Sequence, residues 1–161
     1  MRKKTLLAFI VGAVLAGVIV KRLWKQKFNE SQIAATADCK QKDLYYNWLQ
    51  LKKRGDSISE YVNKTGAKRI AVFGLEETGR LLIDDLRDSD ITTAFTIELN
   101  NPSYVHEYLE VYRLHDDKLP QVDLIIVCPP YELKDAKREL LGQTDANIVA
   151  LESLIIKEKS Q

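Results

Sequence analysis

Arg69–Arg80, with the sequence RIAVFGLEETGR, is the stretch that decides the fold of this chain. Its apolar run Ile70–Phe73 predicts a short buried strand. The run breaks at Gly74, and helical spacing resumes at Gly79. Apolar residues then follow at i+3, i+4 and i+7, namely Leu82, Ile83 and Leu86. A strand, a glycine turn and a helix that opens on the turn form a corner where backbone N–H groups and the positive helix end suit a phosphate.

The corner matches a nucleotide-binding fingerprint in part. The three glycines of G-x-G-x-x-G serve the turn, the approach of a pyrophosphate and the packing of helix on strand. The corresponding residues here are Gly74, Glu76 and Gly79, so a carboxylate replaces the middle glycine. Glu98 ends the next predicted strand and matches the acidic residue that holds ribose hydroxyls. The expected cofactor-binding residues are therefore Gly74, Leu75, Glu76, Gly79, Glu98 and Pro129.

Each of these features also has a purely structural explanation. Gly74 can serve only the turn, Gly79 only the close packing of helix on strand, and Glu98 can be a solvated strand end. Glu76 adds a negative side chain where a phosphate would lie. The sequence leaves open whether a nucleotide, a nucleotide sugar or no ligand occupies this corner.

Strands alternate with helices in the rest of the chain. Strands are expected at Arg69–Phe73, Thr92–Glu98, Val111–Leu114, Val122–Cys128 and Ile148–Leu151, and helices at Glu77–Arg87, Glu132–Leu141 and Glu152–Ile156. This alternation predicts an α/β fold, a Rossmann-like parallel sheet of about five strands with flanking helices. Ligands of such sheets bind beyond the carboxyl ends of the strands, where the strand order reverses. The crevice is then expected between the glycine corner and the segment Cys128–Tyr131.

A helical segment is predicted before the sheet, from Ser31 to Arg54. Its apolar stripe consists of Leu44, Trp48 and Leu51. Such a stripe is more often packed in the core of its own domain than used as a docking face, and we prefer the core interpretation. Ser57-Ile58-Ser59-Glu60 is a capping box that predicts the start of a second, short helix.

The amino-terminal part has the composition of a membrane anchor. Leu6–Val20 has no charged residue, and Thr5–Trp24 reaches the ~20 residues that a spanning helix needs. We prefer an uncleaved single-pass anchor to a signal peptide, because Lys21-Arg22 occupies the place of the small, polar cleavage region. Three basic residues precede the apolar run and four follow it, which places the main domain on the cytoplasmic side of the cell membrane.

Charge and motifs exclude several classes of function. Residues 1–27 hold seven of the 24 basic residues and none of the 23 acidic ones, so residues 28–161 carry a net charge of −6 and are poorly suited to nucleic acid. Cys39 and Cys128 form no C-x-x-C motif, and only two histidines occur, so no metal site is expected. Neither a Tyr-x-x-x-Lys pair nor G-x-S-x-G nor G-K-[ST] occurs, so no catalytic residue is predicted.

The expected organisation has four parts. Residues 1–27 form the anchor, 28–66 the helical segment, 67–157 the Rossmann-like domain and 158–161 a polar tail.

Four segments of this chain resemble a bacterial family of small Rossmann-like domains. The segments are Ile70–Gly79, Thr96–Glu98, Leu119–Val127 and Ile148–Glu152. Domains of the family typically read I-x-I-[YF]-G-x-G-E-x-G, F-I-D, L-P-x-V-D-x-I-I-V and I-x-S-L-E. They occur in capsule and exopolysaccharide biosynthesis proteins, at the amino end of sugar acetyltransferases and polysaccharide-type epimerase/dehydratases, and near glycosyltransferases. The similarity covers residues 66–156.

The resemblance implies binding of a nucleotide or a nucleotide sugar through Gly74, Gly79 and Glu98. The cofactors that we consider for this corner are a nucleotide sugar and NAD(P). The chain departs from the family at Glu76 and lacks an acyltransferase or epimerase part. We therefore expect a membrane-tethered, non-catalytic module of cell-envelope polysaccharide synthesis. It would bind such a ligand or act as a scaffold for a glycosyltransferase or another enzyme of that synthesis. The alternatives are the cofactor-binding subunit of a sugar-nucleotide-modifying enzyme and a protein-interaction module with a ligand-free fold.

Overall fold

The computed structural model describes residues 22, 25, 39–99, 106–114, 118–129 and 131–156. The chain divides into two units, residues 1–42 and 43–161, and the fold below is that of the second unit. The expected spanning segment Leu6–Val20 and the polar tail 158–161 lie outside the described residues. Among the helices that are described, none combines the length and apolar character that crossing a membrane requires.

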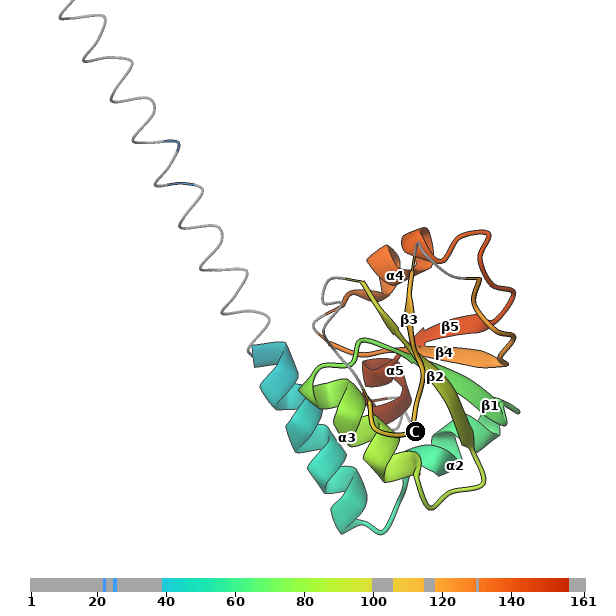
Figure 1. Ribbon diagram of the computed structural model, residues 1–161. Coiled ribbons are helices and arrows are strands. Elements are labelled where there is room, and N and C mark those ends of the chain that lie inside the picture. The colour runs from blue at the N-terminus through green and yellow to red at the C-terminus, as the bar shows by residue number, and fades with distance from the viewer. Residues whose placement is uncertain are drawn as a thin grey trace, which may run out of the picture. The chain divides into compact units, whose positions relative to one another are not determined.

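The centre of the fold is a sheet of five parallel strands (Figure 1). The strands are β1 (Arg69–Phe73), β2 (Thr92–Glu98), β3 (Val111–Arg113), β4 (Leu124–Val127) and β5 (Asn147–Ala150). Their order across the sheet is β3-β2-β1-β4-β5, and all four pairings are parallel. The chain therefore moves outward from β1 to β3 and then returns to the other side of β1. The order reverses between β1 and β4, and a doubly wound sheet has its ligand crevice at such a point.

Helices flank this sheet, so the expected α/β fold is confirmed. They are α2 (Ile58–Lys64), α3 (Glu77–Leu86), α4 (Leu133–Glu139) and α5 (Leu151–Ile156), preceded by helical residues 39–53. β1 and β2 have the predicted bounds, and the other elements of the sheet region differ from the predicted ones by one or two residues at an end. Differences of that size are usual where helices and strands fray.

The sheet is covered on both faces, because alternate strand residues point to opposite sides. In β1, Ile70 and Val72 belong to one hydrophobic cluster, and Ala71 and Phe73 belong to the other. The helix of residues 43–53, together with α2, α3 and α5, contributes to the first cluster, and α4 to the second. Figure 1 shows α4 on the side of the sheet opposite α2 and α3.

The helix of residues 43–53 packs against α3 and belongs to the core. Its buried side chains are Leu44, Trp48 and Leu51, which confirms the core interpretation of this stripe. Trp48 Nε1 donates a hydrogen bond to Asp85 Oδ2 at 3.3 Å, and Lys52 forms an ion pair with the same carboxylate. The Tyr45 hydroxyl lies 3.0 Å from Thr78 Oγ1, in the first turn of α3. These contacts hold α3 along its length and thereby position its amino-terminal end.

Candidate functional site

The glycine corner begins at the carboxyl end of β1. The Gly74 N–H donates to the Ile97 carbonyl at 2.9 Å, so the hydrogen bonding between β1 and β2 continues one residue past the strand. Gly74 then has a φ of +100°, a region that side-chain-bearing residues rarely adopt. α3 starts three residues later, at Glu77. The turn therefore directs the start of α3 back over the end of the sheet.

Gly79 allows the first turn of α3 to contact the glycine turn directly. A Cβ atom built on Gly79 would lie 1.9 Å from the Gly74 carbonyl oxygen and 3.4 Å from Val72 Cγ1. No side chain fits at the shorter distance, because the atom it would meet belongs to the backbone. This is the packing role that the fingerprint assigns to its last glycine.

Tyr131, from the segment that follows β4, lies against Gly74. A Cβ atom on Gly74 would lie 2.8 Å from Tyr131 Cδ2 and 3.1 Å from the Cys128 carbonyl oxygen. The Tyr131 ring also packs edge-to-face on Phe73, with 5.2 Å between the ring centroids. The space left by the missing side chain at Gly74 is therefore filled by the protein itself.

The carboxylate of Glu98 connects the three segments that meet at the corner. Glu98 is buried at the end of β2, where its Oε1 closely accepts a hydrogen bond from the Leu75 N–H. Its Oε2 accepts a hydrogen bond from the Tyr131 hydroxyl at 3.1 Å. A buried carboxylate is costly without such donors, and here both oxygens have one. One N–H of the corner is thus already bound to an anion from within the chain.

The amino-terminal end of α3 is the other part of the corner. Glu76 occupies the N-cap position in an extended conformation, and its side chain makes no capping hydrogen bond. Glu77 is exposed in the first turn. The first N–H groups of a helix have no intrahelical acceptor and carry a partial positive charge. The anion-attracting helix end is thus present, with two carboxylates beside it.

The predicted site residues do lie at one end of the sheet. Gly74, Leu75, Glu76 and Gly79 form the corner, and Glu98 is bonded to it. Pro129, half-buried, follows Cys128, whose N–H donates to the Phe73 carbonyl at 2.9 Å. A contact between any of these residues and a ligand stays a prediction. The sequence offered no signal that Tyr131 bonds Glu98, because the two residues lie 33 positions apart.

The corner contains no activated nucleophile among the described residues. The Cys128 thiol is fully buried, and this burial raises its pKa far above the ordinary value because a thiolate would lose its hydration. In the described part of the chain, no three side chains of His, Cys, Asp or Glu are grouped so that they could hold a metal ion.

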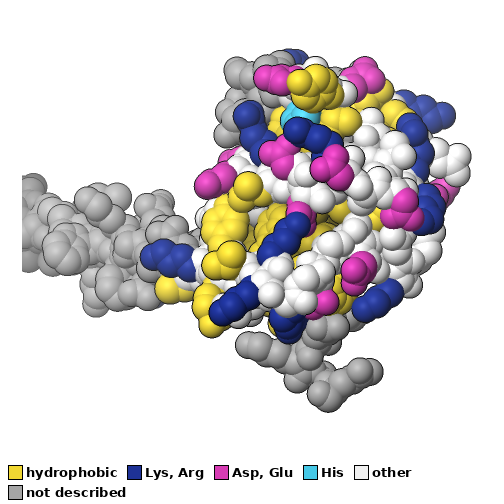
Figure 2. All heavy atoms as spheres, turned by 90° about the horizontal axis from the view of Figure 1, so that it is seen from below, with side chains coloured by type: hydrophobic (Ala, Val, Ile, Leu, Met, Phe, Trp, Pro, Cys, Tyr) yellow, Lys and Arg dark blue, Asp and Glu magenta, His cyan; other side chains and the backbone are white. Residues whose placement is uncertain are grey.

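The visible face in Figure 2 carries charges of both signs. Lys and Arg side chains alternate there with Asp and Glu side chains, around an area of apolar side chains. Nucleic-acid-binding surfaces instead gather Lys and Arg on one face.

Comparisons with known proteins give no match. No protein-family model matches the chain, and neither a curated protein nor a solved structure is significantly similar to it. The resemblance to polysaccharide-biosynthesis domains therefore stays a prediction, and the case for a function depends on the geometry of the corner.

Proposed function

We propose that this chain is a non-catalytic, Rossmann-like module that binds a nucleotide or a nucleotide sugar at the corner between β1 and α3. One observation carries the proposal: the corner lies where the strand order reverses, between the carboxyl ends of β1 and β4. Doubly wound sheets bind ligands at this place, and a helix that opens there receives the phosphate.

Glu98 and Tyr131 limit how the ligand lies. The Leu75 N–H already donates to Glu98, so the phosphate is expected on the first turn of α3. Glu98 is buried and its Oε2 already accepts a hydrogen bond from the Tyr131 hydroxyl, so a ribose at Glu98 would compete with Tyr131. Glu76 repels a phosphate at this position, so we expect weaker binding than at a dinucleotide site with three glycines.

The proposed setting is the cytoplasmic side of the cell membrane, in cell-envelope polysaccharide synthesis. Support comes from the uncharged run Leu6–Val20, from the basic residues on both sides of it and from the resemblance described above. A glycosyltransferase or another enzyme of that synthesis is the partner that this setting implies.

Calorimetric titration tests the binding. The full-length protein in lipid nanodiscs is titrated with UDP-glucose, UDP-N-acetylglucosamine, NAD and NADP, and its thermal unfolding is followed with each. We expect saturable heat and a raised unfolding temperature with at least one of them, because a ligand that binds only the folded state stabilises it. Absence of both effects with all four would contradict the proposal.

A ligand-free interaction module is the second candidate. It is favoured by the internal hydrogen bonds of Glu98 and by the packing of Tyr131 on Gly74, which together explain the corner without a ligand. Large apolar side chains are also exposed on the helices, namely Tyr46, Leu49, Leu81 and Ile156. If this candidate is correct, none of the four ligands gives saturable heat or raises the unfolding temperature. Leu49→Glu then releases a co-purifying partner without lowering the unfolding temperature.

A further inference from the structure

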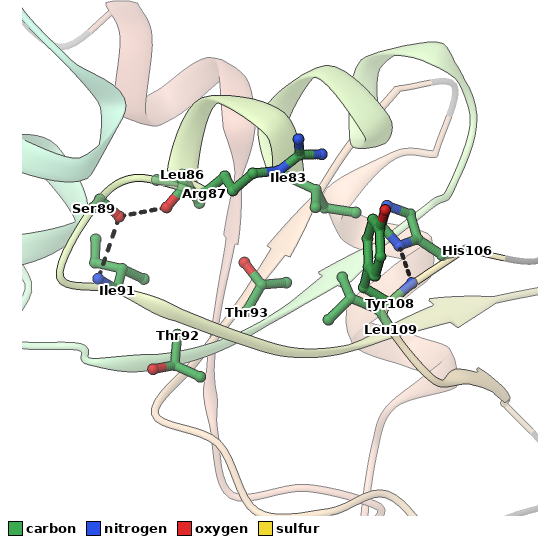
Figure 3. A pocket seen from close by; sticks show the side chains of 10 residues that line it. All are labelled: Ile83, Leu86, Arg87, Ser89, Ile91, Thr92, Thr93, His106, Tyr108 and Leu109. Carbon is green, nitrogen blue, oxygen red and sulfur yellow. Dashed lines mark hydrogen bonds between the residues drawn. The ribbon is translucent and has the colours of Figure 1, made fainter.

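A cavity lies beside the carboxyl-terminal half of α3 and shares no residue with the glycine corner. Its volume is about 610 Å³, within the range of small-molecule sites. One wall is formed by Ile83 of α3 and by Arg87, the residue that caps α3 at its carboxyl end. The floor is formed by Thr93 of β2, and the other wall by Tyr108 and Leu109 (Figure 3).

The cavity exists because of how the chain crosses from β2 to β3. A right-handed crossover between these strands lies on the same face as α3, since both crossovers step in the same direction across the sheet. Residues 106–110, the described part of this crossover, contain no helix. They run beside β2, where the Thr96 N–H donates to the Glu110 carbonyl at 2.9 Å. A cavity therefore remains on this face of the sheet, between α3, β2 and residues 106–110.

The polar side chains that line the cavity can donate hydrogen bonds, and no acidic side chain is among the lining residues. The Thr93 hydroxyl points toward α3 and has no hydrogen-bond partner among the described residues (Figure 3). His106 Nδ1 accepts a hydrogen bond from the Tyr108 N–H at 3.3 Å. A neutral imidazole that accepts at Nδ1 carries its proton on Nε2 and donates there. The Ser89 hydroxyl differs from that of Thr93 because it already has partners within the chain. It donates to the Leu86 carbonyl and accepts from the Ile91 N–H.

Arg87 supplies a positive charge at the mouth of the cavity. Its side chain runs above Ile83 toward Tyr108 (Figure 3). The guanidinium pairs with Asp84, one helical turn earlier, and both side chains are more than half exposed. Exposed pairs of this kind hold their partners weakly, so Arg87 can turn to an anion at little cost.

Tyr108 gives the cavity an aromatic surface. Its side chain is 77% exposed, and its ring lies 6.3 Å, centroid to centroid, from that of His106. Aromatic rings of this kind stack on planar ligands. Ile83 and Leu109 add apolar side chains to the same lining.

We propose that this cavity binds a small planar aromatic molecule that carries one anionic group, a carboxylate or a phosphate monoester. The ring lies against Tyr108 between the two apolar walls, and the anion is held by Arg87, with Thr93 and His106 as further donors. This site does not depend on nucleotide binding at the glycine corner.

Two matched probe pairs test the site in the full-length protein in nanodiscs, with methyl-labelled Ile, Leu and Val. Indole-3-acetate is compared with indole-3-acetamide, and AMP with adenosine, so that each pair differs in its anionic group. We expect an anion to shift the methyl signals of Ile83 and Leu109 in a saturable way and to bind about tenfold more tightly than its neutral analogue. The stronger of the two anions identifies a carboxylate or a phosphate as the ligand group. A nucleotide at the glycine corner instead shifts Val72, which lies beside Gly79.

Two variants and their controls locate the anion. Arg87→Gln is expected to remove the tenfold advantage of the anion, whereas Arg138→Gln on α4, which breaks an equivalent pair with Asp135, leaves it unchanged. Thr93→Val is expected to weaken binding, whereas Thr144→Val, which lies outside the lining of the cavity, leaves it unchanged. Equal affinity of the charged and neutral probes, an unchanged Arg87→Gln protein, or no saturable shift at Ile83 and Leu109 would each overturn the proposal.

Discussion

The carboxylate of Glu98 accepts one hydrogen bond from the Leu75 N–H and another from the Tyr131 hydroxyl. Three segments that are distant in the sequence are therefore joined through one side chain. Sequence patterns located Glu98 at the end of its strand, because the run Thr92–Glu98 is easily recognised as β structure. They did not reveal its partners, which depend on how the segment after β4 folds back on β1.

Truncation of Glu98 measures how much the corner depends on these bonds. Glu98→Ala leaves the buried Leu75 N–H without an acceptor, so we expect a loss of roughly 1–3 kcal/mol in the free energy of unfolding. Tyr131→Phe removes only the second bond and should cost about 1 kcal/mol. Urea unfolding of the full chain measures both values. A Glu98→Ala protein as stable as the wild type would show that these bonds are absent in solution.

Gly79→Ala separates close packing from helix propensity. Alanine favours a helix by about 1 kcal/mol over glycine, so propensity alone predicts a more stable protein. The new Cβ would lie 1.9 Å from the Gly74 carbonyl oxygen, so we expect the steric clash to outweigh the gain in helix propensity. The free energy of unfolding should fall by an amount at the upper end of about 1–3 kcal/mol.

Gly142→Ala is the control for Gly79→Ala. It has free space around it but a φ of +78°, and should cost about 1–2 kcal/mol from backbone conformation. Thermal or urea unfolding compares the two proteins. A Gly79→Ala protein more stable than the wild type would contradict the described contact between the glycine turn and α3.

Asp123 is expected to make stability depend on pH. Its carboxylate accepts hydrogen bonds from the N–H groups of Arg69 and Lys68, at 2.8 and 2.9 Å, and these bonds lower its pKa below the ordinary 3.8. A pKa lowered by folding contributes stability above the unfolded value, and this contribution is lost as the pH falls through the folded value.

Asp123→Asn tests this dependence. The variant should be less stable than the wild type at pH 7, and the difference should disappear in strongly acidic solution. Unfolding temperatures measured from pH 7 to pH 2 check the expectation. A difference that stays constant across that range would assign the effect to packing instead of to charge.

The helices and strands were mostly predictable, because each has a local signal. Ser57 accepts the capping hydrogen bond from the Glu60 N–H at 3.4 Å, as expected at the start of α2. The bounds of β1 follow from an apolar run that ends at Gly74, and those of β2 from a run rich in threonine that includes an aromatic residue. β4 is paired over a shorter range than the apolar run Val122–Cys128 suggested, because pairing depends on its neighbours.

The helix of residues 43–53 offers a matched test of core against surface. Leu51 is fully buried and Leu49 is 65% exposed on the same helix. Leu51→Ala should lower the free energy of unfolding by about 2–5 kcal/mol, whereas Leu49→Ala should change it by no more than about 0.5 kcal/mol. Urea unfolding measures both. Equal effects would mean that this helix does not pack on α3 as described.

At the scale of the whole molecule, α3 connects the glycine corner with a cavity of different chemistry. Its amino-terminal end opens on the glycine corner, and its other half forms one wall of the cavity at Thr93. The corner was predictable from the glycines at positions 74 and 79. The cavity was not, because it arises from the path of residues 106–110 beside β2, for which the sequence has no local signal.

The reversal of strand order between β1 and β4 was expected from the sequence, and the pairing of these two strands confirms it. Alternating strands and helices predict a parallel sheet, and its order fixes which strand ends lie side by side. The pairing of β1 with β4 brings Tyr131 against Gly74, and thereby decides that a ligand must share the corner with an aromatic side chain. Gly74→Val is consequently a poor test of binding, since it would disturb the fold as well as the site.

Removal of the charge at Glu76 is the most direct test of nucleotide binding at the corner. The affinity of UDP-N-acetylglucosamine is measured by calorimetry for the wild type, for Glu76→Gln and for Glu152→Gln, an acidic residue on α5 that serves as the control. Two like charges 4 Å apart in water repel by about 1 kcal/mol, so Glu76→Gln should bind about fivefold more tightly while the control is unchanged. Equal affinities of all three proteins, or no binding by any of them, would contradict a phosphate at the amino-terminal end of α3.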